Sequence, residues 1–460
     1  MRGWRDGGVS FRDFIKQMEE RGEVLHVMDE VSPEFEVSAV MQSFSYNNAP
    51  IISFDNIRGY SGVKIVGNVC GTRRRLCMAL GVSEEKLYDK IIEAVNKPME
   101  PSITEDSPAK EVVEEPRLSK IPILRHFERD AGPYITSAVV SARSPDGRIE
   151  NVSVHRLLVL SDNRLAIRLV PRHLFKLWSM AKEAGKDLDV AIAIGVHPAV
   201  LLAAASSPPL GVSEFGVANR LLNGNLKLVR CERVDAYAPA DAEIILEARI
   251  SRNELVPEGP FVDITGTYDA QRDQPVVEVV KVMRREKYFY HALLPGSPEH
   301  KLLMGLPREA AIYEAVSKVV PRVKAVNLTM GGCGWLHAVI SIEKQVEGDS
   351  KNALLAAFAA HPSLKHAIVV DSDINIFNPE EVEWAIATRF QADEDLIVIR
   401  GARGSTLDPS ANMETGLTTK VGLDATRPLK YPEERFERAR IPISERILKI
   451  IEGLKRDKNQ

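Results

Sequence analysis

Two short stretches of this chain combine side chains that could do chemistry. Residues 151–156 have the sequence NVSVHR, and residues 258–263 have the sequence EGPFVD. Together they offer an amide, an imidazole, a fixed cation and two carboxylates. Side chains of these types can bind a metal ion, hold an anion and move a proton. We therefore expect one binding or catalytic site to which both stretches contribute.

The 151–156 segment opens an apolar run and is predicted to be a β-strand. Alternate residues of a strand point to the same side, so Asn151, Ser153 and His155 would share one face. Arg156 would point to the opposite face of a straight strand, so a ligand shared with Asn151 needs a bulge or a twist. A sheet edge facing water is the alternative interpretation of this polar stripe.

Two further polar residues suggest a metal site. His173 follows Arg172 at the end of the next predicted strand, and Glu214 lies in the loop-like PPLGVSEFG segment before a predicted helix. With the amide oxygen of Asn151 they form a hard ligand set, which suits Mn²⁺ or Mg²⁺ bridging to a phosphate better than structural zinc. A histidine that is only hydrogen-bonded at a strand end is the alternative.

The second stretch places two acids on either side of a turn. Glu258 and Asp263 are separated by a Gly-Pro pair, which cannot continue a central strand. The turn would bring both acids toward one pocket. If Glu258 meets Arg156, the charge-assisted pair would hold the guanidinium, and Asp263 could then donate a proton. An acidic turn facing solvent is the alternative.

Other charged motifs give weaker signals. Lys420 follows two threonines near a glycine, which fits either a phosphate contact or a solvated lysine. Asp371 and Asp373 resemble a metal-binding DxD pair, but we expect a structural role because Asn378 begins a well-capped helix nearby. The basic run over 73–75 is predicted to be solvated or to form salt bridges, since three residues are few for a nucleic-acid patch.

Length and composition restrict the class of protein. The 460 residues are enough for two to four domains of about 100 to 200 residues each. With 60 basic and 64 acidic residues the net charge is −4, which favours neither nucleic acid nor an anionic membrane as a partner. The four cysteines form no Cys-x-x-Cys pair and indicate neither a zinc ribbon nor a disulfide framework. With no membrane span or targeting segment in the sequence, we expect a soluble cytoplasmic protein.

The expected elements divide the chain into three domains of a mixed α/β (α+β) fold. Helical spacing of apolar residues after Ser10, followed by short strands, predicts an α/β N-terminal domain over 1–115. Strand-like runs separated by turns predict a β-barrel-like domain over 116–305. Helices and strands then alternate in an α/β C-terminal domain over 306–460. The Pro- and Glu-rich segment 97–122 is expected to be an exposed connector.

Taken together, the motifs resemble those of a known family. The chain is similar over essentially its whole length to the UbiD-like decarboxylases, which use prenylated flavin mononucleotide (prenylated FMN). The matching pieces are, in order, NVSVHR, Arg172-His173, PPLGVSE, EGPFVD followed by TG, VVDSDINIF with EVEWAIATR, and TTKVGLDAT. Six ordered motifs are more specific than any one of them. The resemblance implies a split β-barrel that binds the flavin and a C-terminal domain that mediates oligomerisation.

The resemblance also implies how the cofactor is held. Asn151, His173 and Glu214 would bind a divalent ion, usually Mn²⁺, against the cofactor phosphate, with K⁺ close by, and Lys420 would contact the same phosphate. The residues expected to contact the cofactor are Asn151, Ser153, Val154, His155, Arg156, Arg172, His173, Glu214 and Lys420.

Three residues would form the catalytic network implied by the resemblance. Arg156 would hold the substrate carboxylate, and Glu258 would orient Arg156. Asp263 would protonate the carbon that CO₂ leaves, while the modified flavin accepts the electrons. Many relatives have Glu at the position of Asp263, and the lost methylene shifts the acid by more than about one ångström, which can cost about a hundredfold in rate if nothing compensates.

Two more departures from the family bear on the substrate. His155 stands where Tyr or a small residue is common, and Arg172 where Gln is common; both add positive or donor character. We therefore expect a second anionic group on the substrate, as in the archaeal branch that acts on trans-anhydromevalonate 5-phosphate in a mevalonate pathway. The predicted reaction is a reversible, non-oxidative decarboxylation of an α,β-unsaturated or aromatic acid.

The resemblance leaves other functions open. It also implies partners for the chain. The alternatives are a 4-hydroxybenzoate-type decarboxylase, a flavin-binding subunit of a carboxylase complex, and a redox flavoenzyme. A flavin prenyltransferase would supply the cofactor, and the chain would form a homodimer or a hexamer.

Overall fold

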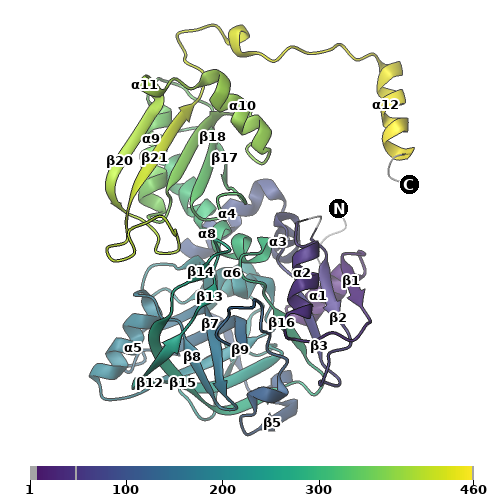
Figure 1. Cartoon of the computed structure of the whole chain (residues 1–460), viewed down its shortest axis with the longest axis vertical. Helices are drawn as coiled ribbons and strands as arrows, with labels where there is room; N and C mark the ends of the chain where they lie inside the picture. Colours follow the sequence, from purple (N-terminus) through teal and green to yellow (C-terminus); the bar gives the residue numbers. More distant parts are fainter. Residues whose placement is uncertain (1–7, 47–48, 458–460) are drawn as a thin grey trace.

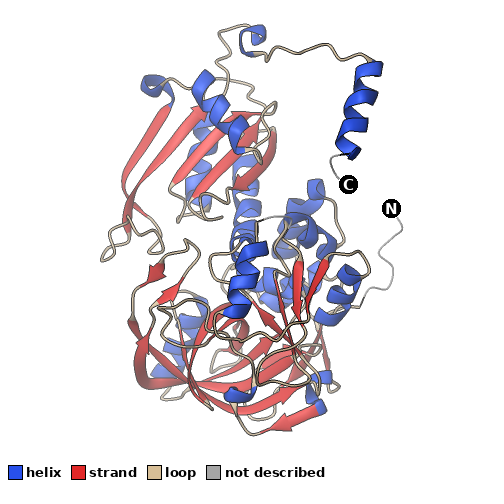
Figure 2. Cartoon of the chain, turned by 45° about the vertical axis from the view of Figure 1, so that its right-hand side comes forward, coloured by secondary structure: helices blue, strands red, loops and turns tan. Residues whose placement is uncertain are grey.

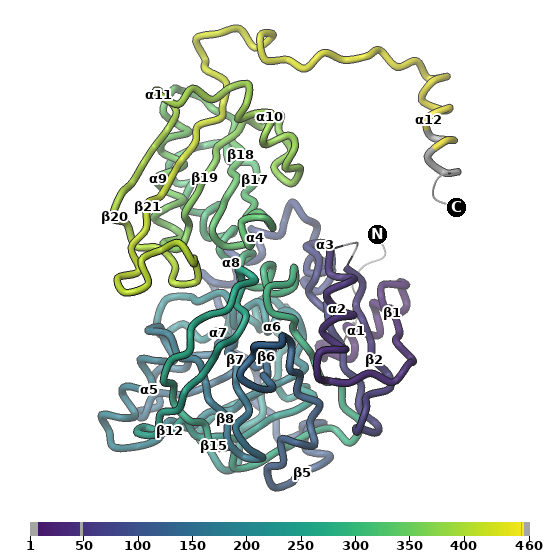
Figure 3. Tube along the Cα trace, viewed as in Figure 1, coloured from purple at the N-terminus to yellow at the C-terminus, as the bar shows by residue number. Residues whose placement is uncertain are grey.

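The computed structural model, which describes residues 8–46 and 49–457, has two lobes (Figure 1). The lower lobe in this view contains a β-barrel and a smaller N-terminal sheet, and the upper lobe contains the C-terminal sheet. The long helix α8 (Pro298–Ser317) connects them. The last helix, α12 (Glu445–Asp457), stands apart from both lobes at the end of an extended segment, as the trace in Figure 3 shows.

The N-terminal region is a four-stranded sheet covered by helices. Its first helix begins as predicted, because the Ser10 hydroxyl accepts from the Asp13 N–H and the Asp13 carboxylate accepts from the Ser10 N–H. The sheet order is β1-β2-β3-β16, in which β16 (Phe289–Ala292) arrives from much later in the chain. The other elements are α1 (Phe11–Glu19), β1 (Val24–Val27), α2 (Glu36–Phe44), β2 (Ile51–Phe54), β3 (Lys64–Gly67), α3 (Arg73–Leu80), the 3₁₀ turn η1 (Glu84–Lys86) and α4 (Leu87–Asn96).

Six strands close the predicted barrel (Figure 2). Their order is β12-β9-β6-β7-β8-β15, and β15 pairs again with β12 to complete the ring. Their buried Val, Ile, Leu and Ala side chains contribute to the two large hydrophobic clusters of the lobe. The strands are β6 (Tyr134–Arg143), β7 (Glu150–Ser161), β8 (Arg164–Ile167), β9 (Leu188–Ile194), β12 (Ile244–Glu258) and β15 (Arg272–Arg284).

Shorter elements surround the barrel and include the two helices that carry predicted metal ligands. The helices are α5 (His173–Glu183), α6 (Pro198–Ser206) and α7 (Glu214–Leu221), and the strands are β10 (Lys227–Arg230), β11 (Tyr237–Pro239), β13 (Phe261–Val262) and β14 (Tyr268–Asp269). Segment 97–122 is largely exposed, as predicted, but two short strands tie it into the lobe: β4 (Ser102–Thr104) pairs with β10, and β5 (Val112–Glu114) pairs with β15. The 3₁₀ turns η2 (Pro108–Glu111) and η3 (Leu118–Lys120) flank β5.

The C-terminal lobe is a five-stranded sheet with the order β17-β18-β19-β21-β20. Asn378 caps α10 as predicted, with its side chain accepting from the Glu380 N–H. Asp371 and Asp373 both accept from Arg389 at 2.7 Å, which confirms their structural role. The elements are β17 (Val323–Leu328), β18 (His337–Ile342), α9 (Asp349–Ala360), β19 (His366–Asp371), α10 (Pro379–Arg389), α11 (Ala392–Asp395), β20 (Leu396–Arg403), β21 (Leu417–Ala425) and the 3₁₀ turn η4 (Glu433–Phe436).

The basic run over 73–75 belongs to helix α3 and forms salt bridges, one of its two predicted roles. Arg73 pairs with Glu309 of α8, and Arg74 pairs with Glu23. Arg75 is 1% exposed and donates to the carbonyl oxygen of Asn68. The Arg73 pair connects the N-terminal region to α8, whereas the contacts of Arg74 and Arg75 lie within the N-terminal region.

Candidate active site

Arg156 of β7 and three carboxylates form the centre of the site. The guanidinium pairs with Glu258 at two points, Nε to Oε1 at 2.9 Å and Nη2 to Oε2 at 3.0 Å. Its Nη1 donates to Asp263 Oδ2 at 2.9 Å, and its Nη2 donates to Asp269 Oδ2 at 3.1 Å. These bonds use four of the five guanidinium N–H groups, so one on Nη1 remains for a ligand. Glu258 and Asp263 were expected here from the sequence, whereas Asp269 was not.

The three carboxylates around Arg156 differ in how far their side chains are exposed. The side chains of Glu258 and Asp269 are 0% and 7% exposed, whereas that of Asp263 is 18% exposed. Burial alone would raise the pKa of Asp269, but a hydrogen bond from Arg272 and the nearby arginine charges hold it below its ordinary value. Asp269 therefore stays ionised between Arg272 and Arg168. Asp263 is the acid best placed to exchange a proton with a ligand.

Two aromatic residues, Tyr134 and Phe261, contact the Arg156–Glu258 pair. Tyr134 Oη donates to Glu258 Oε1 at 3.2 Å and accepts from the Gly259 N–H at 3.2 Å. Burial raises the pKa of Tyr134 above its ordinary value, so its hydroxyl keeps the proton that it donates. The Phe261 ring lies 4.8 Å from the Arg156 guanidinium carbon and 4.3 Å from the Tyr134 ring. The pair is thus fixed by both hydrogen bonds and packing.

The polar face of β7 is arranged as predicted. Ser153 Oγ lies 3.0 Å from Asn151 Oδ1 and 2.9 Å from His155 Nε2, so all three side chains share one face. The β6–β7 register shifts opposite Arg156, where β6 carries one extra residue. Because the extra residue is in β6, the bulge or twist of β7 that would let Arg156 serve the same ligand as Asn151 stays a prediction.

The hydrogen bonds on this face leave one acceptor free. His155 Nδ1 lies 3.1 Å from the carbonyl oxygen of Arg168, which only accepts, so the proton of this neutral ring is on Nδ1 and Nε2 is an acceptor. Burial lowers the pKa of His155 to about 4, which keeps the ring neutral. Ser153 has one hydroxyl proton for two acceptors, Asn151 Oδ1 and His155 Nε2. The acceptor left over is available to a cation or to a ligand donor.

Glu214 lies beside Asn151, although the two residues are 63 positions apart in the chain. It is the first residue of α7, whose N-cap Ser213 accepts from the Phe215 N–H. Its Oε1 accepts from Asn151 Nδ2 at 3.1 Å and its Oε2 from the Val152 N–H at 2.7 Å. The residue is 2% exposed, and burial raises the pKa of Glu214 to about 8. A buried carboxylate beside the Asn151 amide, whose oxygen competes with His155 Nε2 for the one Ser153 proton, fits a divalent cation, which would favour the ionised form.

The predicted third metal ligand is not hydrogen-bonded to the other two. His173 begins α5, and no hydrogen bond joins it to Asn151 or Glu214 among the described residues. Burial and the charge of Arg172 lower the pKa of His173, so its ring is neutral, the form that binds metals. The described chain also contains no group of three His, Cys, Asp or Glu side chains placed to hold a metal. The role of His173 stays a prediction.

Lys420 lies in the other lobe, on β21. Its ammonium donates to the carbonyl oxygen of Pro362 at 2.6 Å and to that of Leu364. Burial lowers the pKa of Lys420 to about 8. Its contact with a cofactor phosphate also stays a prediction, because both of these bonds lie within the C-terminal lobe.

The turn that precedes α8 packs against the turn that carries Asp263. Gly296 packs so closely that a Cβ there would lie 3.2 Å from Gly266 Cα and 3.4 Å from the Asp263 carbonyl oxygen. The Gly296 N–H donates to His300 Nδ1 at 3.1 Å, so the proton of the neutral ring is on Nε2. Burial lowers the pKa of His300, whereas the charge of Asp263 acts in the opposite direction. His300 was missed from the sequence, since no spacing links it to Asp263.

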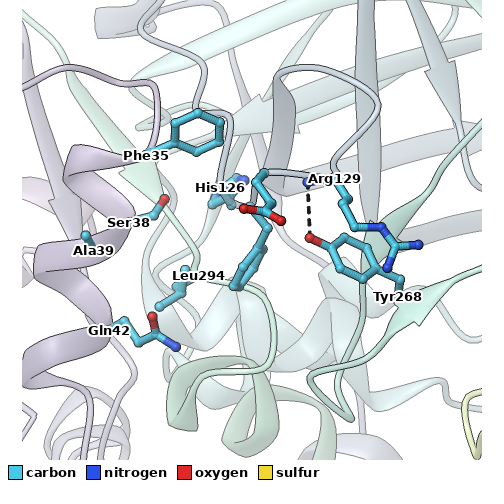
Figure 4. A pocket seen from close by; sticks show the side chains of 10 residues that line it. Phe35, Ser38, Ala39, Gln42, His126, Arg129, Tyr268 and Leu294 are labelled. Carbon is cyan, nitrogen blue, oxygen red and sulfur yellow. Dashed lines mark hydrogen bonds between the residues drawn. The ribbon is translucent and has the colours of Figure 1, made fainter.

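A pocket of about 490 Å³ lies near His126 (Figure 4). Helix α2 and the loop around His126 line it from opposite sides, and Arg129 donates its backbone N–H to Tyr268 Oη at 3.2 Å. The His126 and Phe261 ring centroids are 6.4 Å apart. His126 of the pocket lining thus lies near Phe261, which itself contacts Arg156, and none of the predicted site residues lines the pocket.

Three family models match the chain in order. The N-terminal domain of 3-octaprenyl-4-hydroxybenzoate carboxy-lyase matches residues 15–95, its Rift-related domain residues 102–298 and its C-terminal domain residues 301–425. The chain belongs to the UbiD family. This confirms the family and the fold class that the ordered motifs predicted.

UbiD relatives of known name align over nearly their full length. An anhydromevalonate phosphate decarboxylase from Methanothermobacter thermautotrophicus is 47% identical over 93% of this chain and 99% of its own. An enzyme of the same name from Methanosarcina mazei is 45% identical over 94% of this chain and 100% of its own. The expected enzyme class, a UbiD-type decarboxylase, is thereby confirmed.

Solved structures of UbiD enzymes share the architecture. HmfF from Pelotomaculum thermopropionicum, solved in complex with FMN, is 44% identical, with a TM-score of 0.91 over 94% of this chain and 97% of its own. An evolved dimeric form of HmfF was solved with prenylated FMN and is 40% identical, with a TM-score of 0.88 over 95% of this chain and 97% of its own.

The predicted absence of a transmembrane helix holds for the part of the chain that the structure describes. None of the helices there has the length and apolar character needed to cross a membrane.

Proposed function

We propose that this protein is a reversible, non-oxidative decarboxylase that uses prenylated FMN, and that its substrate is trans-anhydromevalonate 5-phosphate in an archaeal-type mevalonate pathway. The observation that carries the reaction type is Arg156 fixed by Glu258, with one guanidinium N–H free and the more open Asp263 beside it. The names of the most similar relatives support this substrate over a 4-hydroxybenzoate.

The roles of the catalytic residues follow from their contacts. Arg156 would bind the substrate carboxylate with its free Nη1 proton, and Glu258 would keep the guanidinium in place through the two-point pair. Asp269 would support the same orientation from a third side. After CO₂ departs, Asp263 in its protonated form would donate to the remaining carbon. Prenylated FMN, when bound, would supply the electron sink for the bond cleavage.

The residues of the polar face would hold the cofactor. Asn151 and Glu214 present a buried amide oxygen and carboxylate that would hold Mn²⁺ or Mg²⁺ against the flavin phosphate, with His173 as the third ligand. Ser153, Val154 and His155 would line the flavin, and Lys420 would reach its phosphate from the other lobe. K⁺ would bind close to the divalent ion.

The protein would also have partners and a cellular location that follow from this function. A flavin prenyltransferase would supply the cofactor, and the protein would act in the cytoplasm as a homodimer or a hexamer. The dimeric form of HmfF is consistent with such an assembly.

Mass spectrometry of the bound cofactor tests the proposal. The chain is co-expressed with a flavin prenyltransferase, purified with Mn²⁺ and denatured, and the released small molecule is weighed. We expect the mass of prenylated FMN from the wild type and none from Asn151→Ala, which removes the amide oxygen at the metal site. Release of plain flavin, or of nothing, from folded wild-type protein would contradict the proposal and favour a redox flavoenzyme or a complex subunit.

A further inference from the structure

The proposed proton donor, Asp263, lies on a small hairpin at the end of two barrel strands. Glu258 and Arg272 are opposite each other at the end of the β12–β15 ladder. The chain between them forms β13 and β14, which pair with each other at two positions and with no other strand of the described chain. Asp263 follows β13, and Asp269 ends β14. Because an isolated hairpin of this size is marginally stable at best, its position depends on side-chain contacts with the barrel.

Asp269 attaches this hairpin to three barrel segments through one carboxylate. Its Oδ2 accepts from Arg156 Nη2 of β7 at 3.1 Å and lies 3.6 Å from Nε of Arg168, which directly follows β8. Its Oδ1 accepts from Nη1 of Arg272, the first residue of β15, at 2.5 Å. The Asp269 side chain is 7% exposed. Bonds from charged donors to a buried carboxylate are stronger than exposed ion pairs, so the end of β14 is firmly held.

The barrel side of this attachment is fixed independently of Asp269. Glu258 is 0% exposed and holds the Arg156 guanidinium at two points. Phe261, directly opposite Asp269 in the hairpin, has its ring 4.8 Å from the same guanidinium. Arg156 would therefore keep its place without Asp269, whereas the end of β14 would lose two charge-assisted bonds. Asp263, six residues earlier on the same hairpin, would then shift with it.

We propose that Asp269 is a positioning residue for the proton donor: it attaches the β13–β14 hairpin to Arg156 and Arg272 and so fixes the position of Asp263. Asp263 cannot do this itself, because its ion pair with Arg156 is lost whenever it carries the proton that it donates. Asp269 makes its bonds to the two arginines in both protonation states of Asp263. This role is additional to the support of Arg156, and its link to catalysis rests on the proposed function.

Kinetics of Asp269→Asn in the flavin-loaded protein test this role. Asp273→Asn is the matched control, because Asp273 is an exposed aspartate nearby on β15. Displacement of the proton donor should lower kcat by about 10- to 100-fold while KM and flavin content are kept, since Glu258 still holds Arg156. Asp273→Asn should leave both constants unchanged. An unchanged kcat in Asp269→Asn, or a raised KM with kcat kept, overturns the role.

Amide hydrogen exchange gives a readout that does not depend on turnover. In Asp269→Asn the amides of residues 261–269 should exchange about tenfold faster than in the wild type, while those of the barrel strands and of Asp273→Asn stay as protected as in the wild type. Exchange of 261–269 at the wild-type rate overturns the attachment.

A second variant keeps the role testable if Asp269→Asn fails to fold. Arg272 is 31% exposed, and Arg272→Gln removes one of the two charge-assisted bonds of Asp269. It should lower kcat and speed the exchange of 261–269 in the same directions, by smaller factors; no change in either overturns the role. Faster exchange in the variants of a protein whose wild type converts no acid keeps the attachment and refutes the proposed function.

Discussion

Asp263 differs from the other acids around Arg156 because it is partly open, and this single property gives it a distinct role. Asp263→Asn keeps the shape of the side chain but removes the proton that it would donate. We expect decarboxylation to fall by about a hundredfold or more, the effect typical of a lost general acid, with flavin and metal content unchanged. Activity and cofactor content are measured on the same preparation. Full activity, or loss of the cofactor, would refute the assigned role.

A buried histidine beside the site links stability to pH. His126 is 4% exposed, neither ring nitrogen has a hydrogen-bond partner in the described chain, and burial lowers its pKa to about 3. The unfolded chain takes up a proton below about pH 6.5, whereas the folded protein does so only near the lowered value. The free energy of unfolding therefore falls as the pH drops below about 6.5, with a contribution from His126 of about 2 kcal/mol by pH 5.

Replacing that histidine should remove its part of the acid sensitivity. His126→Phe fills a similar volume without a titrating group, so its unfolding free energy should lose about 2 kcal/mol less than that of the wild type between pH 7 and pH 5. Urea denaturation of both proteins at the two pH values measures the difference. Equal losses in the two proteins would show that His126 does not carry this linkage.

The residue-level predictions succeeded where chemical type and local spacing carried the signal. The alternation in NVSVHR predicted the polar face of β7. EGPFVD predicted a turn that brings Glu258 and Asp263 toward one pocket, and the family resemblance added Arg156 to it. Asp269 and Tyr134 were missed because they reach Arg156 and Glu258 only through strand pairing and packing. The only signal for Asp269 was an acid six residues after Asp263, across a Thr-Gly turn.

At the scale of elements, we expect the position of Asp263 to depend on the turn before α8. Gly296 has a φ of +72°, and a Cβ there would meet the turn that carries Asp263. Gly296→Ala should therefore lose about 1 kcal/mol of stability from backbone strain and also lose activity by tenfold or more as the acid shifts. Gly185 is the matched control, since it has the same φ of +72° with nothing within 4 Å of its Cβ position.

Both glycine variants should thus show a similar loss in thermal stability, measured by calorimetry. Only Gly296→Ala should lose turnover. If Gly185→Ala lost as much turnover, or if Gly296→Ala kept it, the position of Asp263 would not depend on this turn.

Elements were predictable where one periodic pattern dominated. Ser10 and Asp13 predicted the start of α1, and Asn378 with its following Pro and Glu predicted the start of α10. Helix α6 was missed because its buried Ala, Val and Leu side chains leave no polar face to define a helical period. Strand β20 was not predicted, although its Leu-Ile-Val-Ile run is typical of a strand; it pairs with β21.

At the scale of the whole molecule, we predict a partner for α12. It stands away from both lobes and exposes Ile447, Leu448, Ile450 and Leu454. We expect this apolar face to pack on a second copy of the chain. Deleting residues 440–460 should then lower the mass of the particle in light scattering, while the melting temperature of the remaining fold stays close to that of a wild-type protomer. An unchanged particle mass would exclude α12 from the assembly interface.

The mutual arrangement of distant segments was not accessible from the sequence. For example, β16 joins the N-terminal sheet through parallel pairing with β3 across more than 200 residues of chain. Contacts of this kind depend on the closed barrel that brings the two ends of the lower lobe together.

The central claim is that this protein cleaves a carbon–carbon bond to CO₂ and replaces it with a proton. The most direct measurement is a reaction of the flavin-loaded wild type with trans-anhydromevalonate 5-phosphate in D₂O, followed by mass spectrometry of the product and quantification of CO₂. We predict one CO₂ per acid consumed and one deuteron on the carbon that carried the carboxylate. Recovery of unchanged acid, or consumption of a nicotinamide with no CO₂, would contradict the account.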